Sequence, residues 1–375
     1  MKILGVIDED PFDHRTWSGS SYYFFKSLMD SGYLCQGIAA TLPTYLTNIF
    51  KVLSFEPNMR KWKFRYRINT NRFEAMTNAA KKTAEKLDNR SYDVILQVGA
   101  WYDLTGFKEK VVVSYHDGNL RVLLDSPYGY PNINYEYIER GLNYEKNIYK
   151  KLHHIFTMSE WLATSFQKDF EVEAKRVTAV GAGINLPYIR EINNKAYSEP
   201  NLLFIGKDFQ RKGGKVLLQA FEKVRKEIKN ATLTLIGPNL AQSSLPEGVK
   251  CLGYISKLDK IGLEVLLNEY TSASVFVMPS LYEPFGIVFA EAMAHKLPCI
   301  GTSICAMPEI VDEGETGFLV PPGDERTLEA RIVDLLKQPE MCREMGERGY
   351  QKYISTYRWD VVTRKIVDKL EGLLL

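Results

Sequence analysis

The strongest pattern in this chain lies between Ser280 and Ala294 and reads SLYEPFGIVFAEAMA. It follows a short apolar run, VFVMP, of the kind that a buried parallel strand shows, and its own apolar residues recur at helical spacing. We therefore expect a strand, a loop and a helix, in that order. Backbone amides at the start of such a helix attract anions, so we expect Phe285, Gly286 and Ile287 to bind a phosphate group.

Two carboxylates, Glu283 and Glu291, stand eight positions apart in the same stretch. Pro284 suits the first turn of a helix, where its missing N–H costs nothing. Eight helical residues span about 12 Å, which is comparable to the reach from a hexose across a diphosphate to a ribose. One helix can therefore hold both ends of a sugar nucleotide. Two solvated surface charges are the plainer interpretation of the spacing alone.

The chain is similar to a known family at these residues and beyond them. The Glu-x7-Glu pattern, followed by PCIGT and by AMPEIVDEGETGFLVPPGD at 306–324, resembles the C-terminal signature of the family 4 glycosyltransferases. The resemblance covers nearly the whole chain and is strongest from Asn201 to Asp324. It implies a retaining enzyme with an α/β architecture, the GT-B fold, in which two Rossmann-like domains face each other across a cleft.

The length of 375 residues suggests two domains, and 45% apolar with 25% charged residues describes a globular protein. Strand patterns alternate with helical ones in both halves, and the apolar pattern lapses between 181 and 200, where we place the linker. We expect an acceptor-side domain at 1–190 and a nucleotide-sugar-binding domain at 200–358. By the resemblance, a last helix at 359–375 packs back on the first domain.

Several classes of protein are disfavoured by this sequence. The opening MKILGVID reads as a strand too short for a signal peptide, and no apolar run reaches membrane-spanning length, so we expect a cytoplasmic protein. The five cysteines form no C-x-x-C pair, which argues against disulfides and thiolate metal sites. No nucleic-acid-binding motif is visible, and neither strand-to-helix turn has the G-x-G-x-x-G of a dinucleotide dehydrogenase.

A basic segment at 58–73, NMRKWKFRYRINTNRF, interleaves Lys and Arg with Trp, Phe and Tyr. The net charge of the chain is only +2, so this concentration of basic residues is local. One interpretation is a surface for a phosphorylated acceptor or for an anionic membrane, with the protein peripheral at its inner face. The other is a strand with one basic, solvated face, which the strict alternation favours.

The second half of the chain opens with a strand pattern, NLLFIG, followed by KDFQRKGG at 207–214. Lys207, Arg211 and Lys212 lie among glycines after this strand, an arrangement that suits a diphosphate, although the spacing is not that of a P-loop. The segment resembles the phosphate clamp of the family, in which the residue after the first Gly and the Lys of the K-G pair contact the leaving group. The family more often has Arg at the position of Lys207, and Arg211 can supply the bidentate contact instead.

Two loops in the first half carry further candidates. Gly19 lies in a Gly/Ser loop after the first strand, and the resemblance implies that this loop approaches the donor diphosphate; a plain helix entry is the alternative. His116 follows the strand VVVSY at a carboxyl end, where ligands collect, and resembles a histidine on the sugar and acceptor side of the family's cleft. A structural loop histidine is the alternative. Asp8 and Asp10 close the first strand, and we assign them no metal.

These observations predict a retaining hexosyltransferase of glycan, polysaccharide or glycolipid biosynthesis that uses a UDP- or GDP-sugar and a carbohydrate or lipid-linked acceptor. By the resemblance, Glu283 binds hydroxyls of the donor sugar, Glu291 binds the ribose, and His116 lines the sugar and acceptor side. Lys212 and the helix amides stabilise the departing diphosphate, so we expect no cofactor and no metal. A sugar-nucleotide 2-epimerase of the same fold and a non-catalytic sugar-nucleotide-binding protein are the alternatives.

Overall fold

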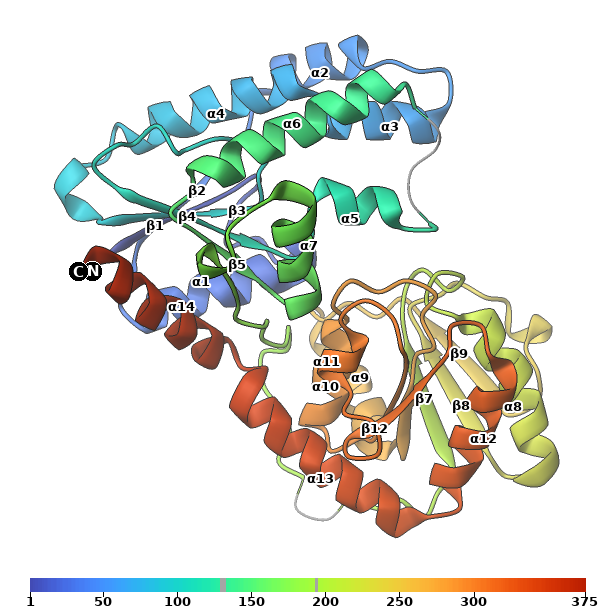
Figure 1. Ribbon diagram of the computed structural model, residues 1–375. Helices are drawn as coiled ribbons and strands as arrows, with labels where there is room; N and C mark the ends of the chain where they lie inside the picture. Colours follow the sequence, from blue (N-terminus) through green and yellow to red (C-terminus); the bar gives the residue numbers. More distant parts are fainter. Residues whose placement is uncertain (129–132, 193–194) are drawn as a thin grey trace. The chain divides into compact units, whose positions relative to one another are not determined.

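The computed structural model describes residues 1–128, 133–192 and 195–375 and divides into two compact units (Figure 1). Unit 1 contains Met1–Gly181 together with Trp359–Leu375, and unit 2 contains Ala182–Arg358. Each unit is built around its own six-stranded sheet. No helix in the described ranges is both long and apolar enough to cross a membrane.

The sheet of unit 1 is wholly parallel, with the strand order β2-β1-β3-β4-β5-β6. Its strands are β1 (Ile3–Ile7), β2 (Leu34–Ala39), β3 (Val94–Val98), β4 (Val111–His116), β5 (His154–Thr157) and β6 (Val177–Ala179). Every residue of β1, β3 and β5 is buried, which is why these strands show mainly apolar residues without a regular polar alternation in the sequence.

Helices cover both faces of this sheet, with α4 and α6 on one side and α1 and α14 on the other (Figure 1). They are α1 (Ser20–Asp30), α2 (Thr44–Leu53), α3 (Met59–Arg67), α4 (Thr70–Ala84), α5 (Leu120–Asp125), α6 (Tyr135–Lys151), α7 (Glu160–Phe170) and α14 (Trp359–Leu374). The last helix, α14, packs against α1: the hydroxyls of Ser27 and Thr363 are hydrogen-bonded at 2.8 Å, and the rings of Phe24 and Trp359 are 5.6 Å apart. The C-terminal helix therefore belongs to unit 1.

The basic segment at 58–73 is helical, so the predicted strand is wrong. The Asn58 side chain caps α3 by accepting a hydrogen bond from the Arg60 amide at 3.0 Å. Phe64 and Ile68, four positions apart, are both buried in a small core with Leu120 and other apolar residues. The alternation of basic and aromatic residues was misleading because only the residues at helical spacing are buried.

The sheet of unit 2 is also wholly parallel, with the strand order β12-β11-β10-β7-β8-β9. Its strands are β7 (Asn201–Ile205), β8 (Thr232–Ile236), β9 (Val249–Gly253), β10 (Val275–Val277), β11 (Cys299–Thr302) and β12 (Gly317–Val320). Its helices are α8 (Gly214–Glu227), α9 (Lys260–Ser272), α10 (Ile287–Ala294), α11 (Met307–Ile310), α12 (Glu325–Leu336) and α13 (Pro339–Thr356). Two parallel α/β units confirm the predicted fold class of two Rossmann-like domains.

The two units divide after Gly181, earlier in the chain than the expected end of the first domain at 190. The polar segment that follows belongs to unit 2 and is hydrogen-bonded to other parts of it. The buried Lys195 ammonium donates to the Tyr270 and Thr271 carbonyls at 3.0 and 2.7 Å, and the Tyr197 hydroxyl donates to the Lys296 carbonyl at 2.6 Å. These hydrogen bonds act together with buried apolar side chains, among them Ile184 and Leu186, to hold the segment. Residues 193–194 of the expected linker lie outside the described residues.

Candidate functional site

In the unit 2 sheet the strand order reverses between β7 and β10. From β7 the chain proceeds to β8 on one side, whereas β10 lies on the other side of β7. Ligands of open α/β sheets bind at the carboxyl ends of the strands where the order reverses. The two loops at this point are 206–213, which follows β7, and 278–286, which follows β10. These are the loops that contain the predicted clamp and the predicted Glu283.

The two loops are in direct contact. The backbone amide of Leu281 donates to the Arg211 carbonyl at 2.8 Å. Gly213, the residue before α8, has φ +74°, and a Cβ atom placed there would lie 1.8 Å from the Pro279 carbonyl oxygen. Only glycine combines this left-handed backbone with so close an approach, and its position is therefore what allows the two loops to pack.

Two cations meet one buried carboxylate where these loops touch. The Lys212 ammonium group is hydrogen-bonded to Oε2 of Glu283, and Nη1 of Arg211 lies 3.4 Å from the same oxygen. Arg211 also donates to the Tyr282 carbonyl at 2.8 Å and to the Asp208 carboxylate at 3.3 Å. Glu283 is only 7% exposed. The structure thus brings together three of the residues that the sequence singled out: Arg211, Lys212 and Glu283.

Burial, together with the neighbouring Arg211 cation, lowers the pKa of Lys212 to about 7. A lysine in this state exchanges its proton near neutral pH. An anion bound beside it would favour the charged form and raise its pKa again, so the site responds to the arrival of a negatively charged group. This behaviour suits a group that neutralises a phosphate.

The helix that follows Glu283 begins later than predicted. Gly286, with φ +77°, is the N-cap of α10, and the first helical residue is Ile287. Pro284 therefore precedes the helix, and Glu283 and Glu291 are not joined by eight helical residues, so the 12 Å span inferred from the sequence does not apply. Phe285 is buried, at 6% exposure. The start of α10 still places its first amides next to the loop that carries Glu283.

Glu291 is buried within unit 2, at 2% exposure. Its Oε1 accepts hydrogen bonds from the Lys257 ammonium at 2.5 Å and from the backbone N–H of Asn185 at 3.3 Å, and its Oε2 accepts one from the Tyr270 hydroxyl at 2.9 Å. Lys257, Asn185 and Tyr270 were not predicted, because they come from three separate segments with no shared motif. The predicted contact of Glu291 with a ribose stays a prediction. Three groups of unit 2 already donate hydrogen bonds to its carboxylate.

Lys207 lies apart from this cluster. Its side chain is exposed, and its ammonium group is 5.6 Å from the centre of the Tyr254 ring. Its backbone is closely packed, because a Cβ atom at Gly237, where φ is +111°, would come within 2.9 Å of the Lys207 nitrogen. The backbone is thus fixed while the charged end remains in solvent. A phosphate contact by Lys207 remains a prediction.

In unit 1, Gly19 ends a strained loop. Trp17, Ser18 and Gly19 all have left-handed backbones, with φ of 50°, 57° and 93°, directly before α1. Such conformations are costly for residues other than glycine and persist mainly where function or tight packing requires them. The Trp17 ring stands edge-on to Tyr115, 5.4 Å away. The loop also follows β1 at the point where the strand order of unit 1 reverses, between β1 and β3.

His116 is the last residue of β4, and its side chain is buried, at 2% exposure. Its Nε2 is hydrogen-bonded to the Ser114 hydroxyl at 2.8 Å, and its ring packs edge-on against Phe166 at 4.9 Å. Burial lowers the pKa of His116 to about 3, so its ring is neutral at physiological pH. The carboxyl end of the strand is where we expected this residue, but the imidazole points into packed side chains. Its predicted role at the sugar stays a prediction.

No cluster of three or more His, Cys, Asp or Glu side chains that could hold a metal ion occurs among residues 1–128, 133–192 and 195–375. Burial raises the pKa of Asp8, at the end of β1. That the reaction needs no metal stays a prediction.

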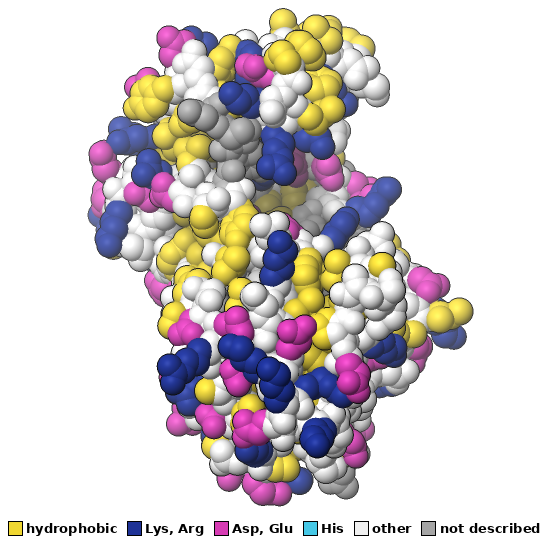
Figure 2. All heavy atoms as spheres, turned by 90° about the vertical axis from the view of Figure 1, so that its right-hand side faces the viewer, with side chains coloured by type: hydrophobic (Ala, Val, Ile, Leu, Met, Phe, Trp, Pro, Cys, Tyr) yellow, Lys and Arg dark blue, Asp and Glu magenta, His cyan; other side chains and the backbone are white. Residues whose placement is uncertain are grey.

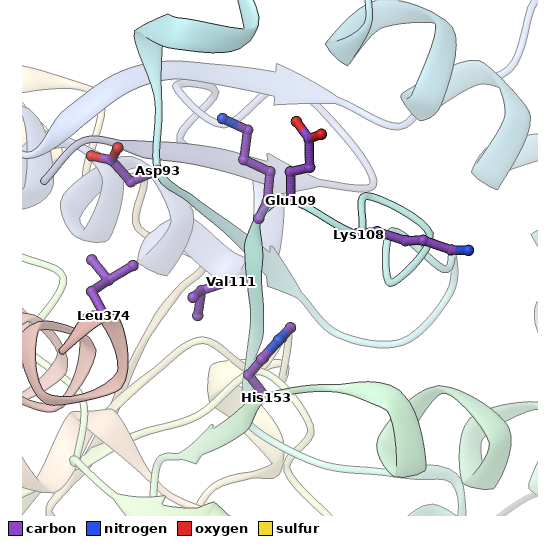
Figure 3. Close-up of a pocket in the computed structure, with 7 residues that line it drawn as sticks. Asp93, Lys108, Glu109, Val111, His153 and Leu374 are labelled. Carbon is purple, nitrogen blue, oxygen red and sulfur yellow. The ribbon is translucent and has the colours of Figure 1, made fainter.

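A pocket in unit 1 is lined by none of the predicted residues. Figure 3 shows its lining around the start of β4: Asp93, Lys108, Glu109, Lys110, Val111, His153 and Leu374. Asp93, Val111 and His153 stand at the amino ends of β3, β4 and β5. Because ligands of parallel sheets collect at the opposite, carboxyl ends, this pocket is not a candidate for the active site.

Comparison with known proteins places these residues in a family context. Residues 187–352, which lie within unit 2, match the family model described as glycosyl transferases group 1. The N-acetyl-alpha-D-glucosaminyl L-malate synthase of Bacillus anthracis is 32% identical over 177 residues, which cover 47% of this chain and 45% of that protein. The chain spans about half the length of the curated relatives it matches.

Solved structures share the fold over the whole chain. A sucrose-phosphate synthase from Thermosynechococcus elongatus aligns with a TM-score of 0.70 at 19% identity, covering 100% of this chain and 99% of the other. The Anabaena protein HepE, solved in complex with UDP, aligns with a TM-score of 0.64 at 15% identity, covering 99% of this chain and 100% of the other. These neighbours confirm the GT-B fold predicted from the sequence.

Proposed function

We propose, from the glycosyl transferases group 1 domain at residues 187–352, that this chain is a retaining glycosyltransferase. It would transfer a hexosyl group from a UDP- or GDP-sugar to a carbohydrate or lipid-linked acceptor in glycan, polysaccharide or glycolipid synthesis. The domain contains the clamp loop and both glutamates. A nucleoside diphosphate is also the class of ligand that the Anabaena structure holds.

The observation that carries this proposal is the contact of Arg211 and Lys212 with the buried Glu283. Glycosyl transfer passes through an oxocarbenium-like state while negative charge builds up on the departing diphosphate. Preorganised cations and helix amides at that position stabilise the charge without rearrangement. Lys212, Arg211 and the first turn of α10 supply such groups, since all three adjoin the loop 278–286.

In this mechanism Glu283 has two roles. It holds Lys212 in place before the donor binds, and one of its oxygens then accepts a hydrogen bond from a hydroxyl group of the donor sugar. With retention of configuration, the leaving phosphate takes the proton of the acceptor hydroxyl, so no separate protein base is required. Charge neutralisation by Lys and Arg also removes the need for a metal ion.

The test is to incubate the purified chain with a panel of UDP- and GDP-hexoses in the presence of EDTA. Differential scanning fluorimetry identifies the bound donor, because a ligand of the native state raises stability by RT ln(1 + [L]/Kd). NMR of the product with candidate acceptors should show transfer with retained anomeric configuration. Epimerised sugar nucleotide formed without acceptor would identify an epimerase instead, and a requirement for Mg²⁺ or Mn²⁺ would overturn the metal-free mechanism.

A further inference from the structure

Exposed apolar side chains are concentrated in one part of unit 1. The described chain has sixteen large hydrophobic side chains that are exposed, and six of them lie within residues 45–59. They are Tyr45, Ile49, Val52, Leu53, Phe55 and Met59, with exposed fractions of 48–73%. We name these six residues the apolar patch. Scattered exposed hydrophobic residues need no explanation, whereas a contiguous group of this kind marks an interaction site.

Four of the six residues of the apolar patch occupy one face of the helix α2. Tyr45, Ile49 and Leu53 recur every four positions along α2, and Val52 lies beside them on the same face. Phe50, on a different face, is buried in unit 1. The helix thus has apolar side chains both toward the protein and toward solvent. A helix on the surface of a globular protein ordinarily has polar residues on its solvent side, so the outer face of α2 calls for a partner.

The patch is joined rigidly to the basic helix α3. The Trp62 indole donates a hydrogen bond to the Lys51 carbonyl at 2.7 Å, and its ring contacts Phe55 edge-on at 5.7 Å. Residues 44–67 contain six Lys or Arg and a single acid, Glu56, which is paired with Arg65 at 2.7 Å. The Lys51, Arg60 and Lys63 side chains are exposed. In Figure 2 hydrophobic and basic side chains lie side by side at the end of unit 1 to which α2 and α3 belong.

We propose that α2 and the turn into α3 form a docking surface for an anionic lipid bilayer. An outward apolar helix face beside basic residues of one sign is the pattern of a helix that lies in the membrane interface, with Trp, Tyr and Phe at the level of the headgroups. The apolar patch enters the acyl boundary, and Lys51, Arg60 and Lys63 bind lipid phosphates. The interaction does not depend on the proposed function, but it would bring unit 1 to lipid-linked acceptors.

Flotation of the full chain with vesicles tests this proposal. Vesicles of phosphatidylcholine with phosphatidylglycerol should carry the protein, and raised NaCl should weaken this binding because charge contributes to it. The double substitution Val52→Ser with Leu53→Ser should reduce binding by about tenfold or more, since both side chains lie in the apolar patch. Lys51→Glu with Lys63→Glu should abolish the preference for anionic over neutral vesicles.

The matched control is Leu258→Ser with Ile261→Ser in unit 2, where the two side chains are 61% and 75% exposed. This pair should leave flotation unchanged, and circular dichroism should show that all variants are folded. The proposal is overturned if the wild-type chain does not float with anionic vesicles, or if the control pair reduces flotation as much as the patch pair. It is also overturned if the patch pair instead dissociates a dimer of the wild-type chain in sedimentation velocity, since a second copy would then be the partner.

Discussion

The Lys212 ammonium group is bonded to the Glu283 carboxylate, although the two residues are 71 positions apart in the chain. The contact exists because β7 and β10 are neighbours in the sheet, so that the loops leaving their carboxyl ends meet. Both side chains are largely buried, at 13% and 10% exposure. A buried ion pair is weak evidence for stability, because the cost of desolvating both charges offsets much of their attraction. The position of this ion pair, where the two loops meet, is better explained by the proposed role in binding the donor.

Lys212→Ala should lower turnover by about 10² or more, because one preorganised charge-stabilising group is lost. The matched control is Lys215→Ala, three residues further on, where the side chain is exposed on α8. Steady-state kinetics with the identified donor measures both variants, and circular dichroism establishes that they are folded. Turnover of Lys212→Ala equal to that of Lys215→Ala would refute the clamp.

The affinity for nucleoside diphosphate should fall as pH rises above about 7. Burial lowers the pKa of Lys212 to about 7, so the free protein loses this cation at higher pH, whereas a bound phosphate retains the proton. The affinity should therefore decrease by up to about tenfold per pH unit until the pKa of the complex is reached. Calorimetry at pH 8 in buffers of different ionisation enthalpy should reveal proton uptake. A pH-independent affinity, or a dependence that persists in Lys212→Ala, would contradict this assignment.

Gly213→Ala should damage the site more than an alanine at another left-handed glycine. The new Cβ atom would lie 1.8 Å from the Pro279 carbonyl, so the two loops must separate. Gly253 is the matched control, because its φ of +68° is similar and nothing lies within 4 Å of the position that a Cβ atom would take there. Gly253→Ala should cost about 1–2 kcal/mol of unfolding free energy from backbone strain alone.

Urea unfolding measures the stability of both glycine variants, and turnover of the folded fraction measures the effect on the site. Gly213→Ala should lose more unfolding free energy than Gly253→Ala and should also lose turnover. Equal losses in the two variants would mean that the loop contact contributes nothing beyond the strain of the left-handed backbone.

Much of the fold followed from apolar runs. The strands β1, β3, β7 and β10 lie inside their sheets and are nearly wholly buried, so they appear in the sequence as short, mainly apolar segments. The edge strand β2 was missed because it is partly exposed, and β12 because four residues give too short a pattern. The helix α3 was misread because only Phe64 within it and Ile68 at its C-terminal end are buried, four positions apart in an alternating sequence.

The site was predictable only where a motif marks it. Lys212 and Glu283 belong to local patterns, and the structure brings them together. The partners of Glu291 could not be found in this way, because Asn185 and Lys257 lie far from it in the chain and in loops without a pattern. Burial of the His116 ring was equally invisible, since the sequence indicates the end of a strand but not the direction of its last side chain.

The two glutamates should recognise different ends of the donor. Glu283 adjoins the cations of the clamp, whereas Glu291 lies in a separate cluster with Lys257 and Tyr270. Glu291→Gln should weaken free nucleoside diphosphate and donor alike, because the ribose is common to both. Glu283→Gln should leave the affinity for nucleoside diphosphate nearly unchanged, because the amide oxygen of Gln can still accept the hydrogen bond from Lys212, and should impair the sugar-dependent step. Calorimetry with both ligands measures the affinities, and single-turnover kinetics measures the transfer step.

A structural role would give a different result, and this makes the comparison decisive. Removing one partner of a buried charged pair typically destabilises a protein by about 3–5 kcal/mol, so the unfolding free energy of each variant has to be measured beside its affinity. A loss of nucleoside diphosphate affinity in Glu291→Gln with unchanged stability would support a ribose contact. If Glu291→Gln lowers stability and leaves the affinity intact, the carboxylate serves to hold Lys257 and Tyr270. If Glu283→Gln loses free nucleoside diphosphate as severely as Glu291→Gln, the division of the donor between the two residues is wrong.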